Sequence, residues 1–200
     1  RSNAVDALIR LAHWFADSDG AATGRMARHK AALPDWAKGN AVPATGTTMQ
    51  PGAHPIGAVY GLPFGRIDAA SLAAFVRTHD CAIRLTPWRL LIAEGIAPAP
   101  ATGMLLADSP ILHVDACVGA PACPQASVET RDLAARLAPS IEGRLHVSGC
   151  AKGCARARAA DWVLTGREGA FDLARHARAG AAPLHTGLTP ERAVALLGAC

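Results

Sequence analysis

The sequence predicts an α+β protein whose larger domain is built on a mixed sheet. Short runs of apolar and β-branched residues alternate with segments in which apolar residues recur at helical spacing. The 200-residue chain is 50% hydrophobic, which supplies enough apolar side chains for a real core. This composition excludes an intrinsically disordered chain and a minimal disulfide-stapled scaffold.

Charge and hydropathy narrow the classes of function. The net charge is +4, and the basic residues are scattered rather than clustered, so we expect no nucleic-acid partner. No apolar run reaches the roughly 18–20 residues of a membrane-spanning helix, and the first residues lack the pattern of a secretion signal. We therefore expect a soluble, cytoplasmic protein with no membrane partner, and a small anionic ligand is compatible with its charge.

The first forty residues predict helical structure. Between residues 4 and 15 apolar side chains recur at the spacing of an amphipathic helix. Residues 41–54 combine Gly, Pro, Thr and Ala without periodicity, which indicates a linker. Because the chain does not begin with Met, we expect it to be part of a longer protein.

The next segment, residues 55–98, predicts a strand-helix-strand unit. Residues 56–62 have the pattern of a strand, Asp68 is placed to cap a short helix, and residues 82–96 form a longer extended segment. Two strands do not make a stable sheet by themselves. We therefore expect this unit to pair with strands from another segment.

Residues 108–200 predict the α+β domain with the mixed sheet. The closing helix is signalled by Thr189 as its N-cap and Pro190 at its first position. The other predicted elements are strands at 110–114 and 145–148, two strands within 162–174 that turn near residues 166–169, and a helix at 127–137.

Four of the six cysteines stand in two close pairs. Cys117 and Cys123 form a C-x5-C, and Cys150 and Cys154 form a C-x3-C, with 26 residues between the pairs. Each pair follows a predicted strand and lies in a Gly-containing loop, whose backbone N–H groups can point at thiolate and sulfide. Four thiolates on two loops predict a [4Fe-4S] cluster.

Other interpretations of the cysteines stay open. Structural zinc sites prefer pairs two to four residues apart, so the five-residue spacer argues against zinc without excluding it. Disulfides are not expected in a cytosolic chain of this size. Unligated cysteine is the plainest alternative, and this is our interpretation of Cys81 and Cys200, to which we assign no function.

The two cysteine pairs resemble the cluster-binding signature of the nitrite and sulfite reductase family. In that family four such cysteines hold a [4Fe-4S] cluster, and the last of them bridges to sirohaem iron. Residues 145–155 (LHVSGCAKGCA) most resemble the precorrin-3B synthase branch, which acts on a tetrapyrrole, whereas the reductases more often have Asn at the position of Lys152. Residues 61–68, 83–89 and 161–172 point to the same branch.

The resemblance implies a molecule of two similar halves, each combining a ferredoxin-like segment with a larger α/β domain. Residues 55–98 would then be a ferredoxin-like half-module, and residues 108–200 a nitrite/sulfite reductase-type [4Fe-4S] domain. Residues 1–40 would be the helical tail of a first half, so the missing N-terminal half is an expected partner. We expect this chain to be inactive alone.

The resemblance also implies roles for particular residues. The four paired cysteines would ligate the cluster, with Cys154 nearest the tetrapyrrole. Arg84 lies in an R-x-T motif whose arginine faces the tetrapyrrole or its bound anion in the family, and Arg89 follows it closely. Both could bind substrate carboxylates. Lys152 could reach a carboxylate or raise the reduction potential of the cluster, and for all three the alternative is a solvated surface side chain.

The activity implied is that of an iron-sulfur monooxygenase of aerobic cobalamin biosynthesis. It would hydroxylate precorrin-3A and form a lactone, with molecular oxygen as oxidant and an electron donor as partner. A non-haem iron is also implied, but among the eight histidines no two-His-one-carboxylate spacing stands out. The alternatives are a sirohaem-dependent sulfite or nitrite reductase and a non-catalytic metal-binding module.

Overall fold

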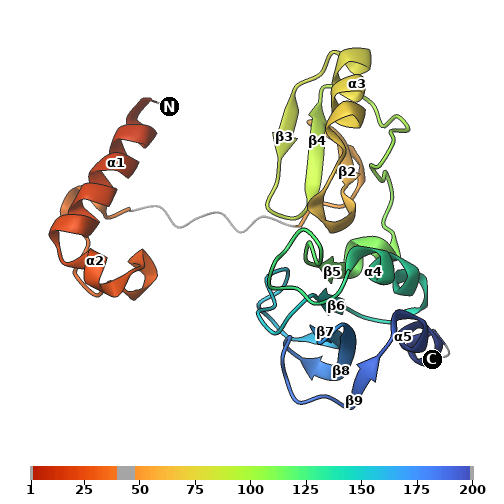
Figure 1. Ribbon diagram of the computed structural model, residues 1–200. Helices are drawn as coiled ribbons and strands as arrows, with labels where there is room; N and C mark the ends of the chain where they lie inside the picture. Colours follow the sequence, from red (N-terminus) through yellow and green to blue (C-terminus); the bar gives the residue numbers. More distant parts are fainter. Residues whose placement is uncertain (1, 40–47, 199–200) are drawn as a thin grey trace. The chain divides into compact units, whose positions relative to one another are not determined.

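The computed structural model describes residues 2–39 and 48–198, and Figure 1 shows their arrangement. The chain divides near residue 47 into two compact units. Residues 41–47, which make up half of the predicted linker, lie outside the described residues, and so does Cys200. None of the helices in the described ranges is long and apolar enough to cross a membrane.

The first unit is built around helix α1 (Ser2–Asp17), which confirms the predicted amphipathic helix. A short helix, α2 (Gly20–Thr23), and two single 3₁₀ turns follow it. His29 packs against the rings of Trp14 and Phe15, at centroid distances of 5.2 and 5.3 Å, and its Nε2 lies 2.8 Å from the Ser18 hydroxyl. These contacts fold the segment after α2 back onto α1.

The second unit contains two sheets, of which the first is antiparallel with the strand order β1-β2-β4-β3. The strands are β1 (Gly52–His54), β2 (Gly57–Gly61), β3 (Ile83–Leu85) and β4 (Leu90–Glu94). Helix α3 (Ala69–His79) covers one face, where Phe75 packs against Tyr60 and Leu91. Asp68 caps this helix as predicted, because its carboxylate accepts a hydrogen bond from the Ser71 N–H at 2.8 Å.

Two predictions for this region are wrong. Residues 82–96 form an antiparallel pair of strands rather than one extended segment, because the chain turns between Thr86 and Arg89, where Arg89 adopts a φ of 59°. Residues 52–54, within the predicted linker, add a further strand. The unit therefore pairs three strands of its own, and the fourth strand of the sheet comes from the residues just before it.

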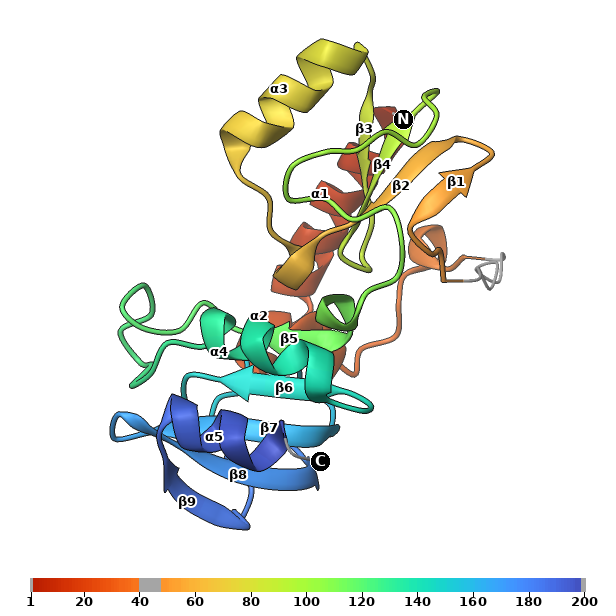
Figure 2. The same ribbon diagram turned by 90° about the vertical axis from the view of Figure 1, so that its right-hand side faces the viewer.

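The second sheet is mixed, as predicted, and has the order β5-β6-β7-β8-β9. Strands β5 (Val114–Ala116), β6 (Leu145–Ser148) and β7 (Ala160–Arg167) are parallel, whereas β8 (Ala170–Ala177) and β9 (His185–Leu188) continue the sheet antiparallel. Helices α4 (Arg131–Leu137) and α5 (Pro190–Leu197) lie over the same face, as Figure 2 shows. Their Leu133, Leu137 and Leu197 join the apolar core of this sheet.

Most predicted elements of this domain are present. The strand at 145–148, the strand pair turning at Glu168 and Gly169, and the Thr189 cap of α5 are confirmed. Residues 110–113 form a 3₁₀ turn rather than a strand, because Pro110 cannot donate to a sheet and favours the first position of a helical turn. Helix α4 begins at Arg131, four residues later than predicted, because the preceding residues belong to the loop of Cys117 and Cys123.

Candidate functional site

Both cysteine pairs lie in loops at the carboxyl ends of parallel strands. Cys117 follows β5, and Cys150 follows β6, its neighbour in the sheet. Since the carboxyl ends of parallel strands share one edge of a sheet, the two loops leave the sheet together. All four paired cysteines line one pocket of about 270 Å³, and none of the four forms a disulfide.

Hydrogen bonds tie the two cysteine loops to each other. The Gly149 N–H donates to Cys117 Sγ at 3.2 Å, and the Ser127 N–H donates to the Gly149 carbonyl at 3.0 Å. The Thr130 hydroxyl donates to the Cys117 carbonyl at 2.6 Å. A backbone donor at sulfur stabilises the thiolate that a metal centre requires. The chain therefore holds the two loops in register through its own contacts.

A glycine permits the close approach of these loops. A Cβ atom on Gly149 would lie 2.6 Å from the Cβ of Ala126. Such a distance is too short for two carbon atoms, so any larger residue at Gly149 would push the loops apart. The Gly in the second cysteine loop thus has a packing role as well as a hydrogen-bonding one.

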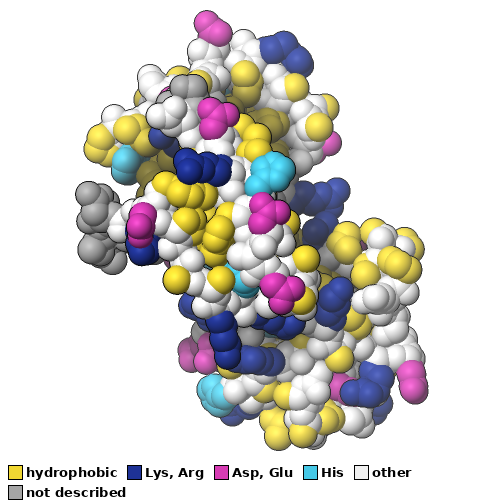
Figure 3. Space-filling view, turned by 90° about the vertical axis from the view of Figure 1, so that its left-hand side faces the viewer, with side chains coloured by type: hydrophobic (Ala, Val, Ile, Leu, Met, Phe, Trp, Pro, Cys, Tyr) yellow, Lys and Arg dark blue, Asp and Glu magenta, His cyan; other side chains and the backbone are white. Residues whose placement is uncertain are grey.

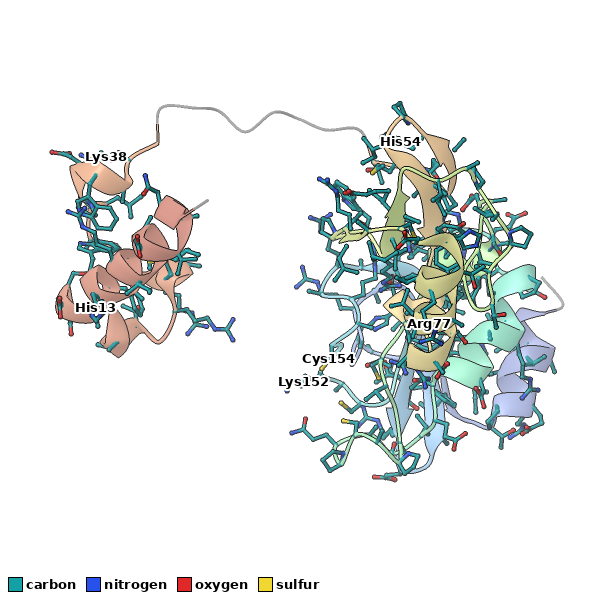
Figure 4. All side chains as sticks on the ribbon, turned by 90° about the horizontal axis from the view of Figure 1, so that it is seen from above. His13, Lys38, His54, Arg77, Lys152 and Cys154 are labelled. Atoms are coloured by element: carbon teal, nitrogen blue, oxygen red, sulfur yellow. The ribbon has the colours of Figure 1, made fainter. Side chains whose placement is uncertain are left out.

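Two cations and an aromatic ring complete the walls of the cysteine pocket, namely Arg89, Lys152 and Phe64. Lys152 is exposed between Cys150 and Cys154, and Figure 4 shows it beside Cys154 at one edge of the unit. Positive charge at this position favours thiolates and a negatively charged metal centre.

Arg89 is oriented by a buried carboxylate. Its Nη1 donates to the Val114 carbonyl at 3.0 Å, and its Nη2 donates to Asp115. The Asp115 side chain is only 6% exposed, and Arg156 and Arg144 also lie within 3.4 and 3.8 Å of it. One buried acid thus faces three guanidinium groups.

A second pocket, of about 600 Å³, adjoins the first and shares Arg89 and Ala155 with it. Its lining includes four arginines, at positions 89, 144, 156 and 158, together with the exposed ring of Trp88. Figure 3 shows Lys and Arg side chains on one face of the molecule, several of them in the lower half of the view. Asp115 offsets part of this charge, and the remaining excess suits a ligand with several carboxylates.

An Asp-His pair stands at the margin of the second pocket. His113 Nε2 lies 2.9 Å from the Asp108 carboxylate, and both residues line the pocket. The hydrogen bond to His113 lowers the pKa of Asp108. This pair places a hydrogen-bonding imidazole beside the arginines.

Arg84 is placed apart from these pockets. It lies on β3, is 61% exposed, and forms an ion pair with Glu94 at 2.5 Å. It is not among the residues that line the cysteine pocket. The structure therefore brings the four cysteines, Arg89 and Lys152 together and leaves Arg84 elsewhere, while Cys81 packs against the core of the four-stranded sheet.

Sequence reasoning missed two buried polar residues beside the cysteine loops, Asp115 and His146. His146 on β6 is fully buried, and neither ring nitrogen has a hydrogen-bond partner. Burial lowers its pKa, an effect that the nearby Asp115 carboxylate opposes. The available signal was a polar residue inside an apolar strand just before a cysteine, as in Val114-Asp115-Ala116-Cys117.

The four paired cysteines can be compared with the ligand set that an iron-sulfur cluster requires. Within residues 2–39 and 48–198, no group of three or more His, Cys, Asp or Glu side chains could hold one metal ion. A [4Fe-4S] cluster binds each cysteine at a different iron, so its ligands surround a volume rather than a point. Four free thiols around one pocket, with a backbone donor at sulfur and cations beside them, match that requirement.

Comparison with solved structures defines the class of fold. The structure of the Mycobacterium tuberculosis NirA protein matches with a TM-score of 0.52 at 21% identity, over 77% of this chain and 38% of that one. The fold described above is therefore shared with NirA over the matched part of the chain. No family model matches the chain.

Comparison with curated proteins is more specific. A precorrin-3B synthase from Sinorhizobium sp. is 32% identical to this chain over 158 residues. The match covers 66% of the chain and 34% of the relative, so the chain spans about one third of that protein's length. The resemblance to precorrin-3B synthase indicated by the cysteine signature is confirmed, and the relative's name points to an enzyme.

Proposed function

We propose that this chain carries a [4Fe-4S] cluster on Cys117, Cys123, Cys150 and Cys154 and takes part in the precorrin-3B synthase reaction. That reaction is the oxygen-dependent hydroxylation of precorrin-3A with formation of a lactone, in aerobic cobalamin biosynthesis. One observation carries the proposal: four cysteines from two distant loops line one pocket in a chain 32% identical to a precorrin-3B synthase.

The chain's own residues have distinct tasks in this proposal. The cluster, when bound, supplies single electrons to the substrate site. The Gly149 N–H stabilises the Cys117 thiolate, and Arg89 and Lys152 offset the negative charge of the four thiolates. Cys154, the most exposed of the four, is the ligand nearest the tetrapyrrole.

Substrate binding is assigned to the second pocket and to Arg89, which lines both pockets. Its arginines can form bidentate hydrogen bonds with the carboxylates of a precorrin, and the Trp88 ring offers an apolar face to the macrocycle. Lys152 lines the cysteine pocket, whereas Arg84 lies apart from both pockets and would have to leave Glu94 to reach a carboxylate.

The assembly proposed is larger than this chain. Residues 55–98 would serve as a ferredoxin-like half-domain and residues 108–200 as the cluster domain. Because the matched relative is about three times as long as its matched part, a segment equivalent to the remainder would complete the tetrapyrrole site. Molecular oxygen and an electron donor are the other partners.

A sirohaem-dependent sulfite or nitrite reductase is the second candidate function. Sirohaem also carries several carboxylates, so the arginine-lined pocket suits it equally well. Lys152 and the Trp88-Arg89 sequence favour the precorrin-3B synthase branch instead. A non-catalytic metal-binding module is the third candidate.

Anaerobic reconstitution of the chain with iron and sulfide tests the cluster. We expect a brown protein with about four irons and four sulfides per chain. Cys123→Ser and Cys154→Ser should each lose most of that iron, measured by metal and acid-labile sulfide analysis. Cys81→Ser, which changes a cysteine outside the pocket, is the matched control and should keep it. A colourless protein with stoichiometric zinc would contradict the proposal and support a zinc module.

Substrate tests then separate the two enzymatic candidates. The intact, full-length protein is reconstituted in the same way and incubated with precorrin-3A and oxygen, and the hydroxylated lactone is sought by mass spectrometry. Binding of precorrin-3A to this chain alone is followed by its absorption spectrum, which measures how much of the tetrapyrrole site the second pocket supplies. Sirohaem absorption in the purified protein, together with sulfite or nitrite reduction, would favour the reductase instead.

A further inference from the structure

Asp115 is the most deeply buried acid in the described part of the chain. It lies on β5, two residues before Cys117. Its Oδ1 accepts a hydrogen bond from Arg89, and its Oδ2 lies 3.4 Å from Arg156 Nη1 and 3.8 Å from Arg144 Nη1. A buried carboxylate is stable only when it is paired. The acid and the three arginines therefore form one interdependent network.

The three arginines come from separate parts of the second unit. Arg89 ends the turn between β3 and β4, Arg144 immediately precedes β6, and Arg156 follows Cys154 by two residues. Arg89 and Ala155 also line the cysteine pocket. Through Asp115, two walls of that pocket are anchored to the edge strand of the five-stranded sheet.

Arg156 and Arg89 also form hydrogen bonds with backbone carbonyl groups. Arg156 Nε donates to the Ala159 carbonyl at 2.8 Å, and its N–H donates to the Gly153 carbonyl at 3.2 Å, so its side chain is fixed relative to the turn that carries Cys154. Arg89 has a φ of 59°, a conformation unfavourable for a residue with a Cβ atom. Its hydrogen bonds to Val114 and Asp115 stabilise that conformation.

We propose that Asp115 is a positioning residue for the cysteine pocket. It holds the loop of Cys154 and the side chain of Arg89 in place, and it balances the positive charge of the guanidinium groups beside the pocket. The inference rests on the cluster proposed above, to which Asp115 is not a ligand. It predicts two separate consequences of losing the carboxylate, one in the loop and one in the cluster.

The consequence in the loop is measured on the cluster-free chain with Asp115→Asn, which keeps the size of the side chain and removes its charge. Trypsin should cleave after Lys152, Arg156 and Arg158 about tenfold faster, because a charged hydrogen bond no longer closes the loop. Asp172→Asn is the matched control. Asp172 is also a buried acid, bound to Arg167 at 2.8 Å, but it lies on β8 and does not line the cysteine pocket. This control should leave the loop cleavage at the wild-type rate.

The consequence in the cluster is measured as a reduction potential after reconstitution. Asp115→Asn should shift the potential to a more positive value, because loss of a nearby negative charge favours the reduced cluster. Arg156→Gln removes a positive charge and should shift it to a more negative value, while also speeding cleavage after Lys152 and Arg158. Both variants loosen the same loop, so general destabilisation would not shift the reduction potential in opposite directions in Asp115→Asn and Arg156→Gln.

Arg156→Gln carries the test alone if circular dichroism shows that Asp115→Asn does not fold. Wild-type cleavage rates and an unchanged potential in the folded variant would overturn the role of Asp115. Absence of iron and sulfide from the reconstituted wild-type chain would instead refute the proposed cluster. The trypsin measurement would then still decide whether Asp115 holds the loop.

Discussion

The two sheets of the second unit differ in what they bury. The four-stranded sheet buries apolar side chains. Tyr60 lies among them, and its hydroxyl donates a hydrogen bond to the Ala99 carbonyl at 2.9 Å. In the described residues, the buried side chains classed as polar or charged all belong to the domain of the five-stranded sheet; they are Asp115, Thr130, His146, Ser148, Thr165 and Asp172. The five-stranded sheet is the larger of the two, with two strands of eight residues where the four-stranded sheet has none longer than five.

The polar residues gather where the cysteine loops leave the sheet. Asp115 and Ser148 lie at the carboxyl ends of β5 and β6, and Thr130 bonds back to the Cys117 carbonyl. A buried polar group costs free energy unless it is paired. Asp115, Thr130 and Ser148 find their partners beside the cysteine loops, so part of the polar burial in this sheet accompanies the cysteine pocket, whereas the four-stranded sheet stabilises the fold by apolar packing.

One glycine in each sheet allows this comparison to be tested. A Cβ on Gly166 of β7 would lie 2.5 Å from the Gly149 carbonyl oxygen, in the backbone of the second cysteine loop. A Cβ on Gly61 of β2 would meet the end of the Leu112 side chain at 2.5 Å, and that side chain can move. Gly166→Ala should therefore lower the free energy of unfolding by about 3 kcal/mol, and Gly61→Ala by about 1 kcal/mol.

The same two variants should differ more in metal uptake than in stability. Gly166→Ala displaces the residue whose N–H donates to Cys117, so iron and sulfide per folded chain should fall well below wild type. Gly61→Ala should retain both in full. Denaturant unfolding and metal analysis provide the two measurements, and equal metal uptake by the two variants would show that the sheets do not divide these roles.

Local signals predicted much of this fold, and contacts between distant segments account for the errors. Asp68 and Thr189 were correctly identified as caps because a cap depends on residues within one helical turn. The spacing of the cysteines likewise predicted two loops after two strands. The turn at residues 86–89 was missed because it is stabilised partly by Arg89 reaching Val114 and Asp115, about 25 residues away in sequence.

The buried His146, on β6 of the five-stranded sheet, predicts that the free energy of unfolding depends on pH. Burial lowers the pKa of His146 below its ordinary value of 6.5, so folding disfavours the charged ring. As the pH falls toward and below 6.5, the unfolded chain binds a proton there more readily than the folded chain does. The free energy of unfolding should therefore decrease as the pH falls from 7 to 5, by at most about 1.4 kcal/mol per pH unit from this residue.

His146→Leu should flatten that slope. Both ring nitrogens lack a hydrogen-bond partner, so an apolar replacement removes a buried polar group and leaves no other polar group without its partner. Denaturant unfolding of the cluster-free chain at several pH values provides the measurement. His185→Gln, at an exposed position on β9, is the control and should keep the wild-type slope. An unchanged slope in His146→Leu would assign the pH dependence to other groups.

The smallest expected effect compares the helix caps of the two sheets. The Thr189 hydroxyl accepts a hydrogen bond from the Arg192 N–H at 3.3 Å, and Thr189→Ala should lower the free energy of unfolding by about 1 kcal/mol at pH 7. Thr189→Ser, which keeps the acceptor, should remain close to wild type in its free energy of unfolding.

The cap of α3 at Asp68 should instead depend on pH. The Ser71 N–H lowers the pKa of Asp68 below 3.8, so the folded state favours the ionised cap. Stability lost in Asp68→Ala should thus be complete above that value and should shrink as the wild-type carboxylate becomes protonated at lower pH. A pH-independent loss in Asp68→Ala would show that this cap acts through packing rather than through its charge.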